Sequence, residues 1–369
     1  MSLKIRVLLF SLLFVVYYGN TQNIVLRDSS QSNEISLIFI GDFMGHQDQI
    51  NAAYDSKTGK YKYDSCFSYI APLLCDADVS IANLEVTIGI KPFSGYPQFS
   101  SPPSFAKAIS DAGVDILSTA NNHSVDKSKA GMERTLHVLD SLNIKHFGTY
   151  YDSKEKDTAS PLIINKNGFK IALLTYTYGT NSLVPIPPNI VNYLDSATIA
   201  KDIADAKKEN PDEIIAYVHW GIQYKNFPSE SQKAWTNYFK KLGVKIVIGS
   251  HPHVVQPMKW NKKDSSLVVY SLGNFVSHQR TFPRDGGAVF KLTLQKKDNK
   301  VIIKNATYAL SWVYEPIVNG HKEYYVLPIK DFENRPSFFA KRKHYDKMMR
   351  YVNHARKHLD SSNLNIKEY

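Results

Sequence analysis

Short apolar runs alternate along this chain with stretches whose apolar residues recur at helical spacing. This alternation is typical of a sheet built from successive strand–helix units. The predicted strands span residues 35–40, 79–82, 115–119, 170–175, 213–218, 245–248 and 267–270. The pattern therefore predicts a fold of the α/β class.

The predicted helices lie between these strands. They span residues 104–112, 127–142 and 197–209, and a further helix follows Ser229. In the second of these, Met132, Leu136 and Leu139 recur at helical intervals. Ser229 stands three residues before Gln232, which is the spacing of a capping box at a helix N-terminus.

The pattern changes beyond Gly286, where apolar and polar residues alternate as in antiparallel strands. Three strands are predicted there, at residues 288–294, 301–309 and 324–328. The tail at 338–359 is predicted to be a basic helix, with Lys341, Arg342, Lys343, Lys347, Arg350, Arg356 and Lys357. It could dock on an acidic partner or a membrane surface. We favour a helix that packs Phe339, Met348 and Val352 on the body of the protein.

The first residues have the features of a secretory signal. Lys4 and Arg6 precede an apolar run at 7–18, and small polar residues follow. The run is shorter than the roughly 20 apolar residues that span a bilayer. We therefore expect export to the periplasm or cell surface, with residues 1–21 as a signal peptide or an N-terminal anchor. The expected division of the rest is a main domain at 34–310 and a C-terminal extension at 311–369.

The two cysteines, Cys66 and Cys75, lie in a segment at 63–74 that is predicted to be helical. Nine helical steps separate two Cα atoms by roughly 13 Å, whereas a disulfide tolerates about 7 Å. We expect two buried thiols, unless Pro72 breaks the helix.

The bulk composition indicates a folded protein with an acidic partner. Hydrophobic residues make up 43% and charged residues 21% of the chain, as in ordinary globular domains. The formal net charge is +11. Such an excess suits a polyanionic polymer, an anionic membrane surface or a nucleic acid, although it also serves simply to solvate a surface.

Polar side chains with ligand atoms follow nearly every predicted strand. They are Asp42, Glu85, Asn122 with His123, His219, and His251 with His253. In open α/β sheets, ligands bind just beyond the carboxyl ends of the strands. Each residue alone has an ordinary explanation, such as a helix cap for Asp42 or a hydrogen-bonded core histidine for His219. The occurrence of all these residues at one expected edge of the sheet is a more specific indication of a ligand site than any single residue.

The types of side chain indicate a site for divalent metal ions. Carboxylate, amide oxygen and imidazole together suit Mn, Fe, Zn or Mg. Two such ions about 4 Å apart clamp an oxyanion, and a carboxylate is the natural bridge between them. An amide oxygen at Asn122 would bind an ion, while the neighbouring imidazole of His123 stays free to move a proton.

Six motifs at these positions resemble the bacterial capsule-synthesis family called CapA or PGA_cap. They are GDFM at 41–44, NLE at 83–85, ANNH at 120–123, HWG at 219–221, GSHPHVVQ at 249–256 and SLGNF at 271–275. The resemblance covers roughly residues 35–276. This family is itself similar to the calcineurin-like metallophosphoesterases. The resemblance therefore implies a four-layer α/β/β/α sandwich of the metallo-dependent phosphatase-like type. It also implies a two-metal site.

The resemblance also implies roles for single residues. Asp42, Glu85, Asn122, His219, His251 and His253 would be metal ligands, with Glu85 near the bridging position. His123 would be the proton donor to the leaving group. Among the other motif residues, we assign Asn83, Asn121, Trp220 and Asn274 to substrate binding. The sequence departs from the phosphoesterase pattern at Met44, where a His is usual, and Gln223 stands where the capsule family often has an acidic residue.

The favoured function is an exported metal-dependent hydrolase in capsule or poly-γ-glutamate biosynthesis. Attack by metal-bound hydroxide with His123 as general acid is the expected mechanism. The expected partner is an acidic polymer such as poly-γ-glutamate or capsular polysaccharide, with a membrane surface or capsule-assembly proteins as further candidates. The alternative is a non-catalytic assembly or export factor that binds an acidic polymer, which Met44 and Gln223 favour. A nuclease ranks lowest, because export and the capsule-type motifs argue against nucleic acid.

Overall fold

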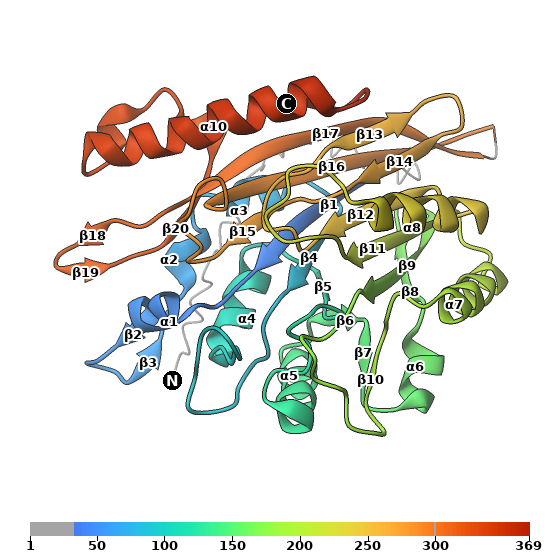
Figure 1. Cartoon of the computed structure of the whole chain (residues 1–369), viewed down its shortest axis with the longest axis horizontal. Helices are drawn as coiled ribbons and strands as arrows, with labels where there is room; N and C mark the ends of the chain where they lie inside the picture. The colour runs from blue at the N-terminus through green and yellow to red at the C-terminus, as the bar shows by residue number, and fades with distance from the viewer. Residues whose placement is uncertain (1–32, 299) are drawn as a thin grey trace, which may run out of the picture.

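Two β-sheets form the centre of the computed structural model, which describes residues 33–298 and 300–369 (Figure 1). The first is a nine-stranded sheet. Its main path runs in the order β20 (Tyr325–Pro328), β17 (Lys300–Tyr314), β16 (Gly286–Lys297), β1 (Glu34–Phe43), β4 (Val79–Leu84), β5 (Ile116–Ser118) and β6 (Lys145–Phe147). In addition, β15 (Asn274–Val276) pairs with β1, and β21 (Lys367–Glu368) pairs with β17. The half from β1 to β6 is parallel, and the half from β16 to β20 is antiparallel.

The second sheet has six strands. Their order is β13 (Met258–Asn261), β14 (Ser266–Val269), β12 (Ile246–Ser250), β11 (Glu213–His219), β9 (Phe169–Thr177) and β8 (Leu162–Lys166). The four inner strands are parallel, and the two edge strands pair antiparallel with their neighbours. All seven strands that were predicted between residues 35 and 270 are present, each in one of the two sheets. The edge strands β8 and β13 were not predicted.

The period-two pattern of β1 explains how the layers are held together. Leu37 and Phe39 point into the apolar layer between the two sheets, where they join Leu173 of β9. Ile38 and Ile40 point the other way, into a second apolar cluster. A strand that is apolar on both faces must be covered on both faces, and β1 is therefore central.

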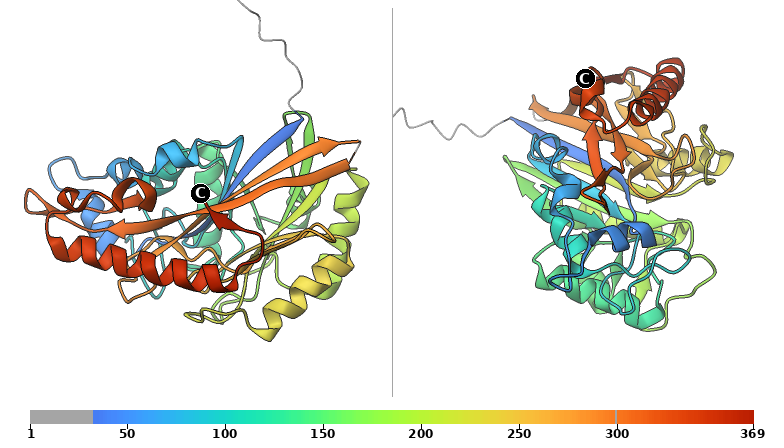
Figure 2. Two further views of the ribbon diagram at one scale, coloured as in Figure 1. Left: turned by 90° about the horizontal axis from the view of Figure 1, so that it is seen from above. Right: turned by 90° about the vertical axis from the view of Figure 1, so that its left-hand side faces the viewer.

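Helices cover the outer face of each sheet, as Figures 1 and 2 show. The first sheet packs on α2 (Asp64–Phe67), α3 (Ala71–Leu74), α4 (Pro103–Asp111) and α5 (Ser128–Ser141). The second packs on α7 (Ser196–Lys208) and α8 (Glu230–Lys241). Ser229 and Gln232 form the predicted capping box of α8. The resulting order of helices, sheet, sheet and helices confirms the α/β/β/α sandwich.

The basic tail helix packs on the body, as favoured above. After α9 (Ile329–Phe332) and η1 (Pro336–Phe338), α10 (Arg342–Ser362) lies along β16 and β17 (Figure 2). Met348 and Val352 are fully buried in the same cluster that fills the space between the sheets, and Phe339 joins them just before the helix. Smaller elements complete the chain: α1 (Gln47–Ala53), β2 (Tyr54–Asp55), β3 (Lys60–Tyr61), β7 (Thr149–Tyr150), α6 (Ser153–Ala159), β10 (Ile190–Val191), β18 (Ile317–Val318) and β19 (His321–Lys322).

Two buried thiols were expected only if Pro72 left the helix intact. The segment breaks into α2 and α3, and Pro72 lies in the first turn of α3, where a missing N–H costs nothing. Cys66 is buried on α2, whereas Cys75 ends α3 and is exposed. Both thiols are free.

The predicted signal or anchor at 1–21 lies outside the described residues. Among the residues that are described, no helix has both the length and the apolar character needed to cross a bilayer. The division into a main domain at 34–310 and a C-terminal extension at 311–369 stays a prediction.

Candidate metal centre

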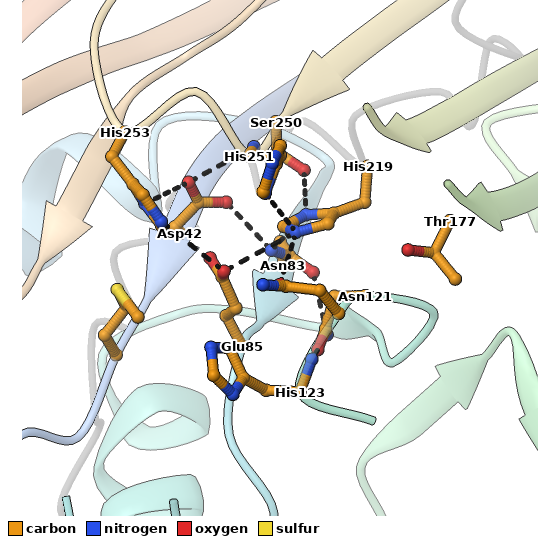
Figure 3. Close-up of polar contacts among 12 residues, drawn as sticks. Asp42, Asn83, Glu85, Asn121, His123, Thr177, His219, Ser250, His251 and His253 are labelled. Atoms are coloured by element: carbon orange, nitrogen blue, oxygen red, sulfur yellow. Dashed lines mark hydrogen bonds and ion pairs between the residues drawn. The ribbon is translucent and has the colours of Figure 1, made fainter. Parts of the chain in front are cut away.

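The ends of strands from both sheets meet at one polar site (Figure 3). Asp42 stands on β1 and Asn83 on β4, and Glu85 follows directly. His219 ends β11, and His251 and His253 follow β12. Because two sheets face each other, carboxylates arrive from the first sheet and imidazoles from the second.

Two groups of side chains have the geometry of ion sites, and they share one member. The ligand atoms of Glu85, His219 and His251 all lie within 4.8 Å of one another, as do those of Asp42, Glu85 and His253. A carboxylate common to both groups is the arrangement expected of a bridging ligand. The predicted ligands are thus brought together, although their binding of metal stays a prediction.

Several acceptor atoms crowd around Nε2 of His219. It lies 2.8 Å from Asn122 Oδ1, 3.1 Å from His251 Nδ1 and 3.5 Å from Glu85 Oε1. Ligands about 2.1 Å from one ion are separated from each other by roughly 3.0–3.5 Å. An amide oxygen, a carboxylate and two imidazoles at these spacings fit Mn, Fe or Zn.

The electrostatics of the site also fit cations. Both carboxylate oxygens of Glu85 are buried without a hydrogen-bond partner among the described residues. Burial and the nearby charge of Asp42 hold the pKa of Glu85 well above its ordinary value. Burial would also raise the pKa of Asp42, but hydrogen bonding and charge from His253 outweigh it and lower this pKa. Burial lowers the pKa of His219 to about 3 and that of His251 well below its usual range, which keeps their lone pairs available.

Asn83 and Asn121 lie behind the predicted ligands. Asn83 Nδ2 donates to Asp42 Oδ1 at 2.8 Å and lies 3.2 Å from His219 Nδ1. Asn121 Nδ2 donates to Leu84 O at 2.7 Å and to Asn83 Oδ1 at 3.2 Å. Both side chains are buried, and neither lines the cavity described below. Their assignment to substrate binding stays a prediction, and the contacts in the structure are with Asp42, His219 and the backbone of Leu84.

Two further residues, Trp220 and Asn274, were predicted to bind substrate. Their side chains also make contacts other than those predicted. Trp220 follows His219 on alternating backbone, so it points to the opposite face. There it packs under α8, and its Nε1 donates to Tyr270 O at 2.9 Å. Asn274 is buried and contacts His253 Nδ1 through its Oδ1 at 3.0 Å. Trp220 is therefore a core residue, and Asn274 orients an imidazole, as groups behind metal ligands commonly do.

His123 stands beside the ion groups in a fixed orientation. Its Nδ1 donates to Asp126 Oδ2 at 2.7 Å, and its backbone N–H donates to Asn121 Oδ1 at 3.0 Å. Asp126 Oδ2 also accepts from the backbone N–H of Phe99 at 2.7 Å, and the Phe99 ring lies edge-on to the imidazole. The contact with Asp126 engages Nδ1, and Nε2 of His123 lies 3.5 Å from Asn181 Nδ2.

A cavity of about 810 Å³ opens onto this centre. Asn122, His123 and His253 line it, together with residues that the sequence analysis did not assign, including His46, Tyr96, Asp126, Asn181, Tyr224, His278, Arg280 and Arg284. Only Asp126 had a signal in the sequence, because it stands three residues after His123. The others come from loops whose positions depend on the packed fold.

Met44 lies at the position where phosphoesterases have a His. Its side chain is buried at the cavity, and its sulfur accepts a weak hydrogen bond from Gln279 Nε2 at 3.8 Å. A thioether is a poor ligand for hard ions. Gln223 also lines the cavity.

Residues 36–279 match the family described as "Bacterial capsule synthesis protein PGA_cap". The chain belongs to this family. The match spans every motif named above, from GDFM to SLGNF, and confirms the resemblance.

Two relatives are identical to the chain at about a quarter of the aligned residues. Capsule biosynthesis protein CapA of Bacillus anthracis is 26% identical over 283 residues, which cover 73% of this chain and 66% of that protein. PGA biosynthesis protein CapA of Bacillus subtilis (strain 168) is 26% identical over 294 residues, which cover 76% and 74%. Among solved structures, the calcineurin-like phosphoesterase YfkN from Bacillus subtilis aligns with 88% of this chain and 98% of its own, at 13% identity and a TM-score of 0.43.

Proposed function

We propose that the chain is an extracytoplasmic, metal-dependent hydrolase that acts on an acidic polymer or its precursor in capsule biosynthesis. One observation supports the proposal: two groups of side chains that could hold ions share Glu85, and the cavity beside them is lined by His123 together with Asn122 and His253. Membership of the capsule synthesis family supports the setting, and the net charge of +11 suits an anionic polymer.

The ions and the side chains would have different roles in the reaction. Bound divalent ions would polarise the substrate and lower the pKa of water. Asp42, Glu85, Asn122, His219, His251 and His253 would hold them. His123 would give a proton from Nε2 to the departing oxygen or nitrogen. Asp126 would keep the imidazole in the tautomer and orientation that this transfer requires.

The test compares His123→Ala with the unaltered chain. Both would be loaded with Mn²⁺ and assayed on a panel of phosphoesters and γ-glutamyl amides. We expect His123→Ala to lower kcat by 10²–10⁴-fold, the usual worth of a positioned general acid, with metal content unchanged by elemental analysis. Asp126→Asn should lower kcat less and change its pH profile. Unchanged turnover in His123→Ala would remove this residue from the mechanism.

A non-catalytic binding role is the second candidate, and Met44 is the observation that favours it. Without a His at this position one ion would have fewer ligands. Elemental analysis of the protein with and without His251→Ala separates the cases. Bound metal that is lost in His251→Ala, with no turnover of any substrate in the panel, would establish a binding role and end the hydrolase proposal.

A further inference from the structure

The loop at 277–285, between β15 and β16, carries two arginines into the cavity. Because β15 pairs with β1, this loop begins beside the metal centre. Neither Arg280 nor Arg284 belongs to the groups that could hold an ion. They introduce positive charge into a cavity that is also lined by two of the predicted metal ligands, Asn122 and His253.

Arg280 is anchored, and its charge is compensated. Its Nε donates to Glu315 Oε1 at 3.1 Å, and its Nη2 donates to Val313 O at 2.7 Å. The guanidinium carbon lies 5.4 Å from the centre of a Trp312 ring. Its Nη1 is buried without a hydrogen-bond partner in the described part of the chain. A buried donor of this kind is costly unless a ligand satisfies it.

Arg284 is the uncompensated cation of this loop. Its guanidinium carbon stands 3.3 Å above the ring centre of Tyr224, a cation–π contact that holds the group flat. Within residues 33–298 and 300–369, the guanidinium forms no ion pair with a carboxylate. The backbone around it is fixed, because Arg284 N–H donates to Thr281 O at 2.9 Å.

A single amide ties Arg284 to the metal centre. Asn274 Nδ2 donates to Arg284 O at 2.8 Å, while Asn274 Oδ1 contacts His253 Nδ1 at 3.0 Å. The same side chain therefore sets the position of an imidazole ligand and of the cationic loop. An anion held by Arg284 would lie at a fixed place relative to the bond that reacts.

We infer that Arg284, with the free Nη1 of Arg280, forms a subsite for one carboxylate of the substrate, adjacent to the metal centre. This inference rests on the proposed function and names its substrate class, an acidic oligomer with a carboxylate beside the reacting bond. One uncompensated cation matches a single negative charge better than a phosphate dianion. The planar guanidinium fork also fits a carboxylate bidentately.

The test measures binding of a synthetic γ-glutamate trimer to the full chain loaded with Mn²⁺, by isothermal titration calorimetry. Arg284→Gln should weaken binding by about 10- to 100-fold, the loss expected for a charge-assisted hydrogen-bond pair. Arg284→Lys should fall between the two, because it keeps the charge without the fork. Arg342→Gln is the control, since Arg342 is exposed on α10 and paired with Asp346; it should bind as the unaltered chain does.

The inference has clear conditions for rejection, and three of the four come from Arg284→Gln and from competition. They are equal affinity of Arg284→Gln and the unaltered chain, loss of metal or of thermal stability in Arg284→Gln, and competition by inorganic phosphate but not by glutarate. Equal binding of the trimer and of the trimer methylated on its α-carboxylates, which are the free carboxylates beside each γ-linked amide, would also count against it. These results do not depend on turnover. If the chain binds the trimer through Arg284 but hydrolyses no substrate, the subsite stands and only the hydrolase proposal fails.

Discussion

The surroundings of a buried carboxylate indicate whether it belongs to a site or only lowers stability, and Glu85 and Glu213 illustrate the two cases. Burial raises the pKa of both Glu85 and Glu213. Glu85 stands among imidazoles and a second carboxylate, which fits a site for cations. Among the residues that the structure describes, Glu213 accepts a hydrogen bond only from the backbone N–H of Ile214, and the charge of Lys245 lies nearby. We therefore interpret Glu213 as a cost to stability and not as part of a site.

Glu213 should make the stability of the fold depend on pH. Burial raises its pKa to about 7, from an ordinary value of 4.5. The folded state then holds the proton more tightly, so stability falls as pH rises from about 4.5 through 7. Glu213→Gln should raise the free energy of unfolding at pH 8 by about 1–2 kcal/mol and change it little at pH 5. Urea unfolding at both pH values measures this.

The exposed Glu230 provides the control for this pH dependence. Glu230→Gln should show no such difference between pH 5 and pH 8. An equal effect of Glu213→Gln at both pH values would show that ionisation is not the cause.

At the scale of elements, the site depends on how closely β1 approaches the turn before β15. The register of β1 against β4 shifts between Ile40 and Asp42, at Gly41. A Cβ on Gly41 would lie 2.1 Å from Gly273 O. This contact of backbones places Asp42 opposite Asn274 in the strand pairing. A glycine is required here for close approach, and not for a left-handed conformation.

Gly41→Ala should therefore damage both the fold and the metal centre. The added methyl group must displace backbone, which typically costs about 1–3 kcal/mol of unfolding free energy. It should also weaken Mn²⁺ binding, because Asp42 moves with the strand. Gly179→Ala is the matched control, since nothing lies within 4 Å of a Cβ there. Thermal unfolding and metal titration measure the two effects, and a Gly41→Ala protein with normal values of both would contradict this account.

At the scale of the whole molecule, the apolar layer between the sheets continues under α10. Tyr351, Val352 and Ala355 of this helix are almost completely buried in the same cluster as Phe290 of β16. Phe282 of the cavity loop lies against the same helix, 4.9 Å from the ring of His354. The C-terminal helix therefore supports both the core and the loop that carries Arg284.

A charge placed on the inner face of α10 should unfold the protein readily. Val352→Asp buries an unpaired carboxylate in an apolar layer and should cost about 3–5 kcal/mol. Asn353→Asp adds the same charge one residue later, at an exposed position, and should stay within about 0.5 kcal/mol. Denaturant unfolding compares the two. Similar stabilities would mean that α10 is not part of the cooperative core.

Local pattern predicted the inner strands of the second sheet and α8, because each depends on neighbours in the chain, but it missed the edge strands β8 and β13. The strands β1, β11 and β12 follow from apolar runs, and α8 follows from the cap at Ser229. The motifs also identified the family and the side chains that meet at the rim, since parallel strands align their carboxyl ends.

Only the tertiary structure decided which face each side chain takes and which loops surround the cavity. Trp220 and His219 are adjacent in sequence, yet alternation sends one to the core and the other to the site. Arg284 is remote from Tyr224 in sequence, and their contact exists only because the two loops meet. Such pairings depend on long-range packing of two sheets and a distant helix, which no local pattern encodes.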